Sequence, residues 1–190
     1  MRRRTMTDAA HASLQSAFIA HAQAWPDEAD EARRFIALLD EGVHAFTRER
    51  LAGHFTASAL LVSADGTRAL LTHHRKLDRW LQPGGHADGD TDLAAVALRE
   101  AGEESGLEGL RLEGGIFDLD RHWIPERKGV PGHWHHDVRY VVRAGEVEAF
   151  VVGEESHDLA WVAVEAIAAD AAMDASLRRM ARKWLERAPQ

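Results

Sequence analysis

The chain has 190 residues, of which 45% are hydrophobic and 28% charged, and it carries a formal net charge of −8 with no cysteine. This composition is typical of a globular protein with a proper core, and the absence of cysteine excludes disulfides, cysteine zinc sites and thiol nucleophiles. The acidic balance, without a long Lys/Arg run, argues against a partner that is duplex nucleic acid or a membrane. Residues 1–4 look like the start of a signal peptide, but no apolar segment follows them, so we expect a cytoplasmic location.

The first quarter of the chain is predicted to be helical. Apolar residues recur at helical spacing over residues 8–25 and again over residues 27–41. We expect residues 1–52 to form a helical extension packed on the core, and residues 53–190 to form the main domain. A homodimer interface and an element that determines substrate specificity are the alternatives for this extension.

Strands and helices alternate through the rest of the chain. Residues 54–63 and 68–74 are rich in apolar and β-branched residues and are joined by a predicted hairpin turn. Residues 80–83 lead into a predicted turn at Gly84 and Gly85. Further strands are expected over residues 110–120, 133–144 and 160–162. One helix is expected after the Gly84–Gly85 turn, and others over residues 164–169 and 172–187. This mixed order predicts an α/β (α+β) fold.

Residues 84–107 combine a glycine-rich turn with an acidic helix, for which Asp90 or Thr91 is the expected N-cap. Three glutamates at positions i, i+3 and i+4 fall within about 60° of one another on one face of that helix: Glu100, Glu103 and Glu104. Arg99 is expected to project roughly 100° away from Glu100, so it would not fully neutralise the cluster. Gathered carboxylates suit Mg²⁺ or Mn²⁺, whereas the plainer interpretation is a solvated acidic face.

The spacing across this stretch resembles the Nudix box, G-x5-E-x7-R-E-U-x-E-E-x-G-U, in which U is an aliphatic residue. The matching residues are Gly85, Arg99, Glu100, Glu103, Glu104, Gly106 and Leu107, with Ala101 as a small version of the first aliphatic position. One position departs from the pattern, because Thr91 stands where the box has its first glutamate. In the family that glutamate mainly supports the box, so the departure affects the supporting residues more than the ligand set.

The resemblance implies the Nudix fold, which is a mixed β-sheet between helices, with residues 53–190 as the Nudix hydrolase domain. It implies a metal-dependent hydrolase that cleaves a pyrophosphate linkage in a small nucleoside-diphosphate-type substrate, with Mg²⁺ or Mn²⁺ as the cofactor. The implied metal ligands are Glu100, Glu103, Glu104 and the carbonyl of Gly85. The implied catalytic residues are Glu100, Glu103, Arg99, Glu154 and Glu155. Arg99 would orient the glutamates, and Glu100 or one of the two late glutamates would act as the general base.

Two predicted strands carry alternating polar residues, which share one face of each strand. These residues are His133, His135, Asp137 and Arg139 in one strand, and Asp118, Asp120 and His122 in the strand before it. We expect them to line a polar cleft that binds substrate, because an exposed sheet face would more often carry Lys, Glu and Thr. The alternatives are a solvent-exposed face and a zinc site that includes His133 and His135.

Two further pairs have an open assignment. Arg75 and Lys76 follow a predicted strand and are expected to bind a substrate phosphate, with a solvated loop as the alternative. Glu154 and Glu155 precede the strand predicted at 160–162, and a surface or helix-capping role is their alternative.

Two other functions compete with the hydrolase. One is a Nudix-fold sensor that binds a nucleotide-like ligand without turnover, for which Thr91 is the best sequence support. The other is isopentenyl diphosphate isomerase, which shares the fold, but the resemblance to that enzyme includes a catalytic cysteine that this chain lacks.

Overall fold

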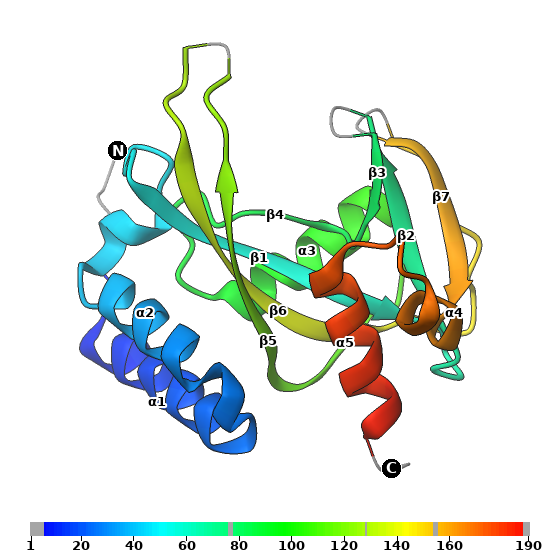
Figure 1. Ribbon diagram of the computed structural model, residues 1–190, viewed down its shortest axis with the longest axis horizontal. Helices are drawn as coiled ribbons and strands as arrows, with labels where there is room; N and C mark the ends of the chain where they lie inside the picture. The colour runs from blue at the N-terminus through cyan, green and yellow to red at the C-terminus, as the bar shows by residue number, and fades with distance from the viewer. Residues whose placement is uncertain (1–5, 76–77, 128, 154–155, 188–190) are drawn as a thin grey trace.

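The computed structural model describes residues 6–75, 78–127, 129–153 and 156–187 (Figure 1). Within these residues the strands are β1 (Gly53–Val62), β2 (Arg68–His74), β3 (Arg79–Leu81), β4 (Gly84–His86), β5 (Arg111–Ile124), β6 (His133–Arg143) and β7 (Ser156–Ala163). They form one sheet with the order β3-β2-β1-β6-β5, in which β4 also pairs with β1 and β7 with β2. Strands β1 and β6 run parallel and the other pairs run antiparallel, so the predicted mixed sheet is confirmed.

The helices lie on both faces of this sheet (Figure 1). They are α1 (Asp8–Ala24), α2 (Ala29–Leu39), α3 (Leu93–Ser105), α4 (Val164–Ala169) and α5 (Ala175–Glu186), with 3₁₀ turns η1 (Pro26–Glu28) and η2 (Gly42–Phe46). Helices α1, α2 and α3 share one apolar cluster with the sheet, and α4 and α5 share another. This arrangement confirms the predicted sheet between helices. No helix among the described residues is long and apolar enough to cross a membrane.

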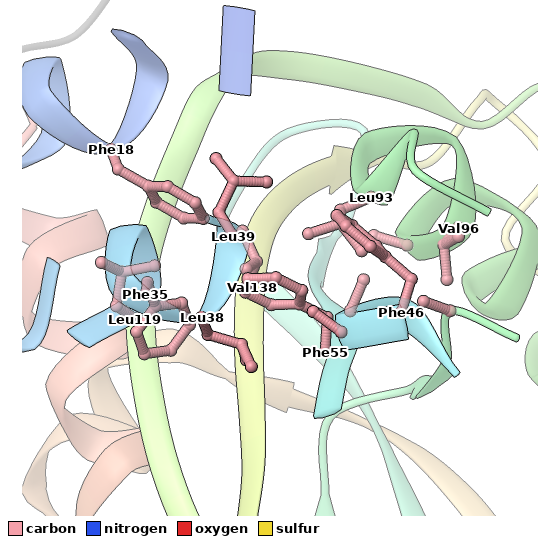
Figure 2. Packing of buried hydrophobic residues seen from close by; sticks show 14 of the residues in the cluster. Phe18, Phe35, Leu38, Leu39, Phe46, Phe55, Leu93, Val96, Leu119 and Val138 are labelled. Carbon is pink, nitrogen blue, oxygen red and sulfur yellow. The ribbon is translucent and has the colours of Figure 1, made fainter. Parts of the chain in front are cut away.

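The N-terminal helices are held by aromatic packing against β1 (Figure 2). The rings of Phe18 and Phe35 lie 5.7 Å apart, and each lies within 6.2 Å of the Phe55 ring. Phe46 from η2 packs 4.8 Å from the same Phe55 ring. Because all four rings are fully buried, these helices share the core of the sheet. The division of the chain between residues 52 and 53 stays a prediction.

Several predicted elements need correction. Gly84 and Gly85 lie in strand β4 rather than in a turn, since β4 pairs with β1 in the register Ser58 to Gly84. Strand β5 continues to Ile124, past the predicted end at residue 120, because β6 provides pairing partners as far as His133. The N-cap of α3 is Asp92 rather than Asp90 or Thr91, because the Asp92 side chain accepts a hydrogen bond from Ala95 N.

Candidate metal and catalytic site

Helix α3 brings two of its glutamates against strand β4 of the sheet. Its buried side chains include Leu93, Val96, Ala97 and Ala101, which pack against the sheet. The helix begins at the Asp92 cap and ends at Gly106, which adopts the left-handed conformation with a φ of 68°. Glu100 follows Val96 by four residues and Ala97 by three, so it lies on the same side of the helix as these buried residues, where it meets strand β4.

The backbone of β4 comes directly against two of these glutamates. The Gly84 N–H donates a hydrogen bond of 2.8 Å to Glu104 Oε1. A Cβ atom placed on Gly85 would lie 2.5 Å from Glu100 Cδ and 2.9 Å from Glu100 Oε1. Since real Cβ atoms do not approach other atoms this closely, only glycine fits against Glu100 in the present arrangement. The glycines and glutamates of the box therefore form one compact unit.

Arg99 contacts the glutamate cluster more extensively than we expected from its helical angle. Its guanidinium donates a 2.9 Å hydrogen bond to Glu100 Oε1, and its Nε lies 3.8 Å from Glu103 Oε1. The hydrogen bond to Glu100 raises the pKa of Arg99 above its ordinary value. The expected direction away from Glu100 is thus wrong, because the long side chain folds back to the carboxylates. Arg99 thus contacts two of the three glutamates, Glu100 and Glu103.

This donor set is chemically suited to a hard divalent cation. Within the described ranges, the three glutamates do not bring three carboxylate oxygens within 4.8 Å of one another. Mg²⁺ does not require this, because it is usually held by one or two carboxylates together with water and substrate phosphates. The side chain of Glu103 is 65% exposed and that of Glu100 is 19% exposed. Mg²⁺ or Mn²⁺ therefore fits the residues present, and the individual ligand assignments stay predictions.

The alternating polar residues of β5 and β6 do share one face, as predicted, and β1 extends it. The strand register aligns them in cross-strand rows: His54, His135 and His122; Thr56, Asp137 and Asp120; and Ser58, Arg139 and Asp118. The hydroxyls of Thr56 and Ser58 donate to Asp137 at 3.0 and 2.7 Å. One continuous polar face therefore crosses three neighbouring strands.

Helix α5 covers one end of this face with cations. Arg179 contacts Asp118 at 2.7 Å and Asp120 at 3.1 Å, and Lys183 contacts Asp118 at 2.7 Å. Arg139 contacts the same two aspartates at 3.4 and 3.2 Å. Burial opposes ionisation of Asp118, yet its hydrogen bond from Arg179 and the nearby charges hold its pKa below the usual value. Asp118 and Arg139 are thus held in a buried ion-pair network, while Asp120, Arg179 and Lys183 also line a pocket beside η1.

The opposite end of the polar face is a cluster of histidines. The rings of His54, His86, His133 and His135 lie within 4.9–5.2 Å of one another in five pairwise contacts. His122 lies 5.4 Å from His135 and contacts Asp120 at 3.1 Å. Burial lowers the pKa of His86 to about 4 and that of His135 to about 2. The rings of His86 and His135 are therefore neutral at neutral pH.

The remaining predicted residues fall in two groups. Arg75 is exposed after β2 and donates a 3.1 Å hydrogen bond to the Ser156 carbonyl at the start of β7. Lys76, Glu154 and Glu155 lie outside the described residues. The roles of all four in binding or catalysis stay predictions.

Comparison with known proteins settles the family. The model of the NUDIX domain matches residues 53–184. This chain belongs to the Nudix family. Nudix hydrolases generally need divalent metal ions, in agreement with the donor set of α3.

Individual Nudix proteins resemble the chain to different degrees. A Mycobacterium tuberculosis protein named "Putative 8-oxo-dGTP diphosphatase 3" is 36% identical over 125 residues, which are 61% of this chain and 55% of that protein. The chain thus spans about half the length of this relative. The solved Caenorhabditis elegans Ap4A hydrolase has a TM-score of 0.55 at 20% identity, covering 69% of this chain and 94% of that one. A Clostridium perfringens hydrolase of the NUDIX family has a TM-score of 0.55 at 23% identity, covering 70% and 96%. These two structures share the fold.

Sequence reasoning missed His54 and His86 as partners of the His133 and His135 pair. His54 begins β1, where it stands beside His135 in β6, and His86 ends β4. The available signal was the concentration of twelve histidines in this short chain, several of them at strand ends. The pairing of β1 with β6 across some 80 residues could not be read from local patterns.

Proposed function

We propose that this protein is a metal-dependent pyrophosphohydrolase that cleaves a phosphoanhydride linkage in a nucleotide-type substrate. The observation that carries this proposal is the seating of Glu100 and Glu104 against the backbone of Gly84 and Gly85. A hydrolase that handles pyrophosphate needs negative ligands fixed relative to a rigid backbone, so that a divalent cation can meet both protein and phosphate oxygens. The acidic face of α3 with β4 supplies such a place.

The proposed roles follow from the contacts. Glu100, Glu103, Glu104 and the Gly85 carbonyl would hold Mg²⁺ or Mn²⁺, which offsets phosphate charge and lowers the pKa of water when bound. Glu100 accepts the proton of the attacking water, with Glu154 or Glu155 as the alternative acceptor. Arg99 fixes Glu100 and Glu103 in position through its two contacts.

Substrate binding is assigned by accessibility. His133, His135 and Arg75 retain exposed surface and are proposed to contact the substrate, together with Lys76. Asp118, Asp137 and Arg139 are almost fully buried, so they are proposed to support the sheet face on which the substrate binds rather than to contact the substrate. Asp120 is intermediate in burial between these residues and the exposed ones. The name of the M. tuberculosis relative makes purine nucleoside triphosphates, including 8-oxo-dGTP, the first class to test.

A substrate screen tests the proposal. Purified protein is incubated with nucleoside triphosphates, nucleotide sugars, ADP-ribose, NADH and dinucleoside polyphosphates, with Mg²⁺ or Mn²⁺, and phosphate is measured after coupling to a phosphatase. We expect turnover that EDTA abolishes. The Glu103→Gln/Glu104→Gln double variant should lose about 10²-fold or more in kcat. The exposed Glu108, close to the end of α3, provides the matched control Glu108→Gln, which should keep wild-type activity.

Two outcomes would contradict the proposal. Wild-type turnover by the double variant on a confirmed substrate would remove the glutamates from the mechanism. No turnover of any compound, combined with thermal stabilisation by one of them, would favour the sensor. Thr91, which directly precedes the Asp92 cap of α3, is the specific feature that favours that second function.

A further inference from the structure

The histidine cluster contains a side chain whose hydrogen-bonding capacity is unmet. His54 is 3% exposed, and its Nε2 atom is buried and has no hydrogen-bond partner among the residues that the structure describes. Its other ring nitrogen, Nδ1, lies 3.4 Å from the Arg50 carbonyl, which can only accept, so the proton belongs on Nδ1. Nε2 therefore carries a lone pair directed into the protein. A buried polar atom without a partner costs free energy, and such an atom calls for a ligand.

Two neighbouring histidines direct their Nε2 atoms toward each other. His133 Nδ1 lies 2.9 Å from the Pro131 carbonyl, which can only accept, so in the neutral ring the proton belongs on Nδ1 and Nε2 carries the lone pair. This Nε2 accepts a 3.2 Å hydrogen bond from the Nε2–H of His135. One ligand nitrogen from each of His54, His133 and His135 lies within 4.8 Å of the others. Two of the three rings thus have the tautomer fixed by a backbone carbonyl, as is usual for metal-bound histidine.

The distances suit a tetrahedral metal ion. With Zn–N bonds of about 2.0–2.1 Å, two ligand nitrogens of a tetrahedral site are separated by about 3.3–3.4 Å. The 3.2 Å between His133 and His135 is close to this value. The nitrogen of His54 has to approach by at most about 1.4 Å, which is the difference between the 4.8 Å limit and the tetrahedral edge. Ring rotation of the half-exposed His133 and His135 can supply this movement.

We propose that His54, His133 and His135 form a second metal site, which binds a Zn²⁺-class transition-metal ion through three imidazoles. Imidazole nitrogens suit Zn²⁺ and not Mg²⁺, so this site takes a different ion from the carboxylates of α3. For His135 to bind through Nε2, its ring proton has to move from Nε2 to Nδ1 through solvent, so that three neutral imidazoles ligate the ion and no net proton is released. Three protein ligands leave a fourth position for water or an oxygen of a bound molecule.

The proposed site adjoins His86, the residue of β4 that comes directly after Gly85 of the Nudix box. His86 follows Gly85, and its ring lies 5.2 Å from His54 and 4.9 Å from His135. A cation bound by His54, His133 and His135 would therefore lie beside His86, which belongs to the same strand as Gly85, the residue against which Glu100 packs. The proposal does not depend on pyrophosphatase activity, since it is a statement about metal binding alone.

Cobalt provides the direct test, because its visible absorption distinguishes tetrahedral nitrogen ligation from octahedral oxygen ligation. Untagged protein is treated with chelator, returned to chelator-free buffer and titrated with Co²⁺, and Zn²⁺ binding is measured by calorimetry. We expect one equivalent of tetrahedral Co²⁺ that Zn²⁺ displaces. The band should persist in the Glu103→Gln/Glu104→Gln variant, which separates the triad from the carboxylate site.

Ligand variants complete the test. His135→Ala should weaken Zn²⁺ binding by more than the roughly 10- to 100-fold that loss of an outer-shell partner costs. His133→Ala, near the start of β6, gives a second variant if His135→Ala fails to fold by circular dichroism. His122→Ala is the matched control, because its Nδ1 is engaged with Asp120, and it should retain the tetrahedral band. A purely octahedral spectrum, or unchanged Zn²⁺ affinity in both ligand variants, would overturn the proposal.

Discussion

Replacing Gly85 with alanine tests the core geometry of the box with a single methyl group. The added Cβ would lie 2.5 Å from Glu100 Cδ and 2.9 Å from Oε1. Gly85 has no positive φ, so alanine meets no backbone penalty there. The substitution is therefore expected to act only by displacing the Glu100 carboxylate.

The size of the effect follows from the overlap. Ordinary contact with a Cβ begins at about 3.4 Å, so the Glu100 carboxylate has to move by about 0.9 Å or more. A misplacement of about 1 Å in a catalytic arrangement can cost about 10²-fold in rate. We expect Gly85→Ala to lower kcat about 10²-fold and to raise the concentration of Mn²⁺ needed for half-maximal activity. Stability should change by less than about 1 kcal/mol, because Glu100 is a flexible side chain that can turn toward solvent.

Two other glycines provide controls for this experiment. At Gly102 in α3, a Cβ would meet its nearest atoms at 3.9 Å, so Gly102→Ala should keep activity and stabilise the helix by up to about 1 kcal/mol. At Gly84, a Cβ would lie 2.7 Å from the Ser58 Cα atom, which cannot turn away, so Gly84→Ala should lower the melting temperature. The assay is steady-state hydrolysis beside thermal unfolding. If Gly85→Ala retains activity within about threefold of wild type, the seating of Glu100 is not needed for catalysis and the reasoning fails.

Two further predictions concern stability. Asp118→Asn removes the charge that pairs with Arg139 and with the cations of α5, so it should lower the free energy of unfolding by about 3–5 kcal/mol in urea titrations. The exposed control Glu165→Gln should change it by no more than about 0.5 kcal/mol. If the two variants lower stability equally, the ion-pair network is not important for stability. Burial, together with the charges of Arg121 and Arg50, lowers the pKa of His136 to about 4. Between about pH 6.5 and pH 4 the unfolded chain therefore binds one proton that the folded chain does not bind. The free energy of unfolding should fall as the pH falls through this range, by roughly 3 kcal/mol at most. His136→Phe keeps a ring in the apolar cluster and should make this pH slope shallower in pH-dependent melting, whereas an unchanged slope would remove His136 as its source.

The features that could be predicted from the sequence are those that depend on the spacing of residues close together in the chain. The box placed Gly85 and Glu100 in one unit, and strands β1 and β2 and helix α4 lie close to their predicted bounds. The cap of α3 could not be resolved, because Asp90, Thr91 and Asp92 are all good caps in consecutive positions. Only the orientation of the Asp92 carboxylate toward Ala95 N decides between them.

The polar face shows why the rest could not be predicted. Alternation along β5 and β6 correctly predicted which residues share a face. Whether that face is open depends on α5, which reaches Asp118 from some 60 residues further along the chain. Likewise, the side chain of Arg99 returns to the glutamates although its Cβ points elsewhere, because long side chains are not confined to the direction of their Cβ. The covering of a sheet face by a distant helix and the choice of side-chain rotamer both depend on tertiary structure, so local sequence patterns do not predict them.

The two ends of this polar face differ in a way that bears on the metal proposal. At the α5 end, the carboxylates of Asp118, Asp120 and Asp137 are matched by Arg139, Arg179 and Lys183 among the described residues, so the buried charges are compensated. At the other end, the same strands present imidazoles, including the His54 ring, whose Nε2 atom has no hydrogen-bond partner among the described residues. The His54 lone pair is thus the point at which a further component would bind. A transition-metal ion would accept this lone pair and those of His133 and His135 at once, whereas the proton between the Nε2 atoms of His133 and His135 satisfies only two rings.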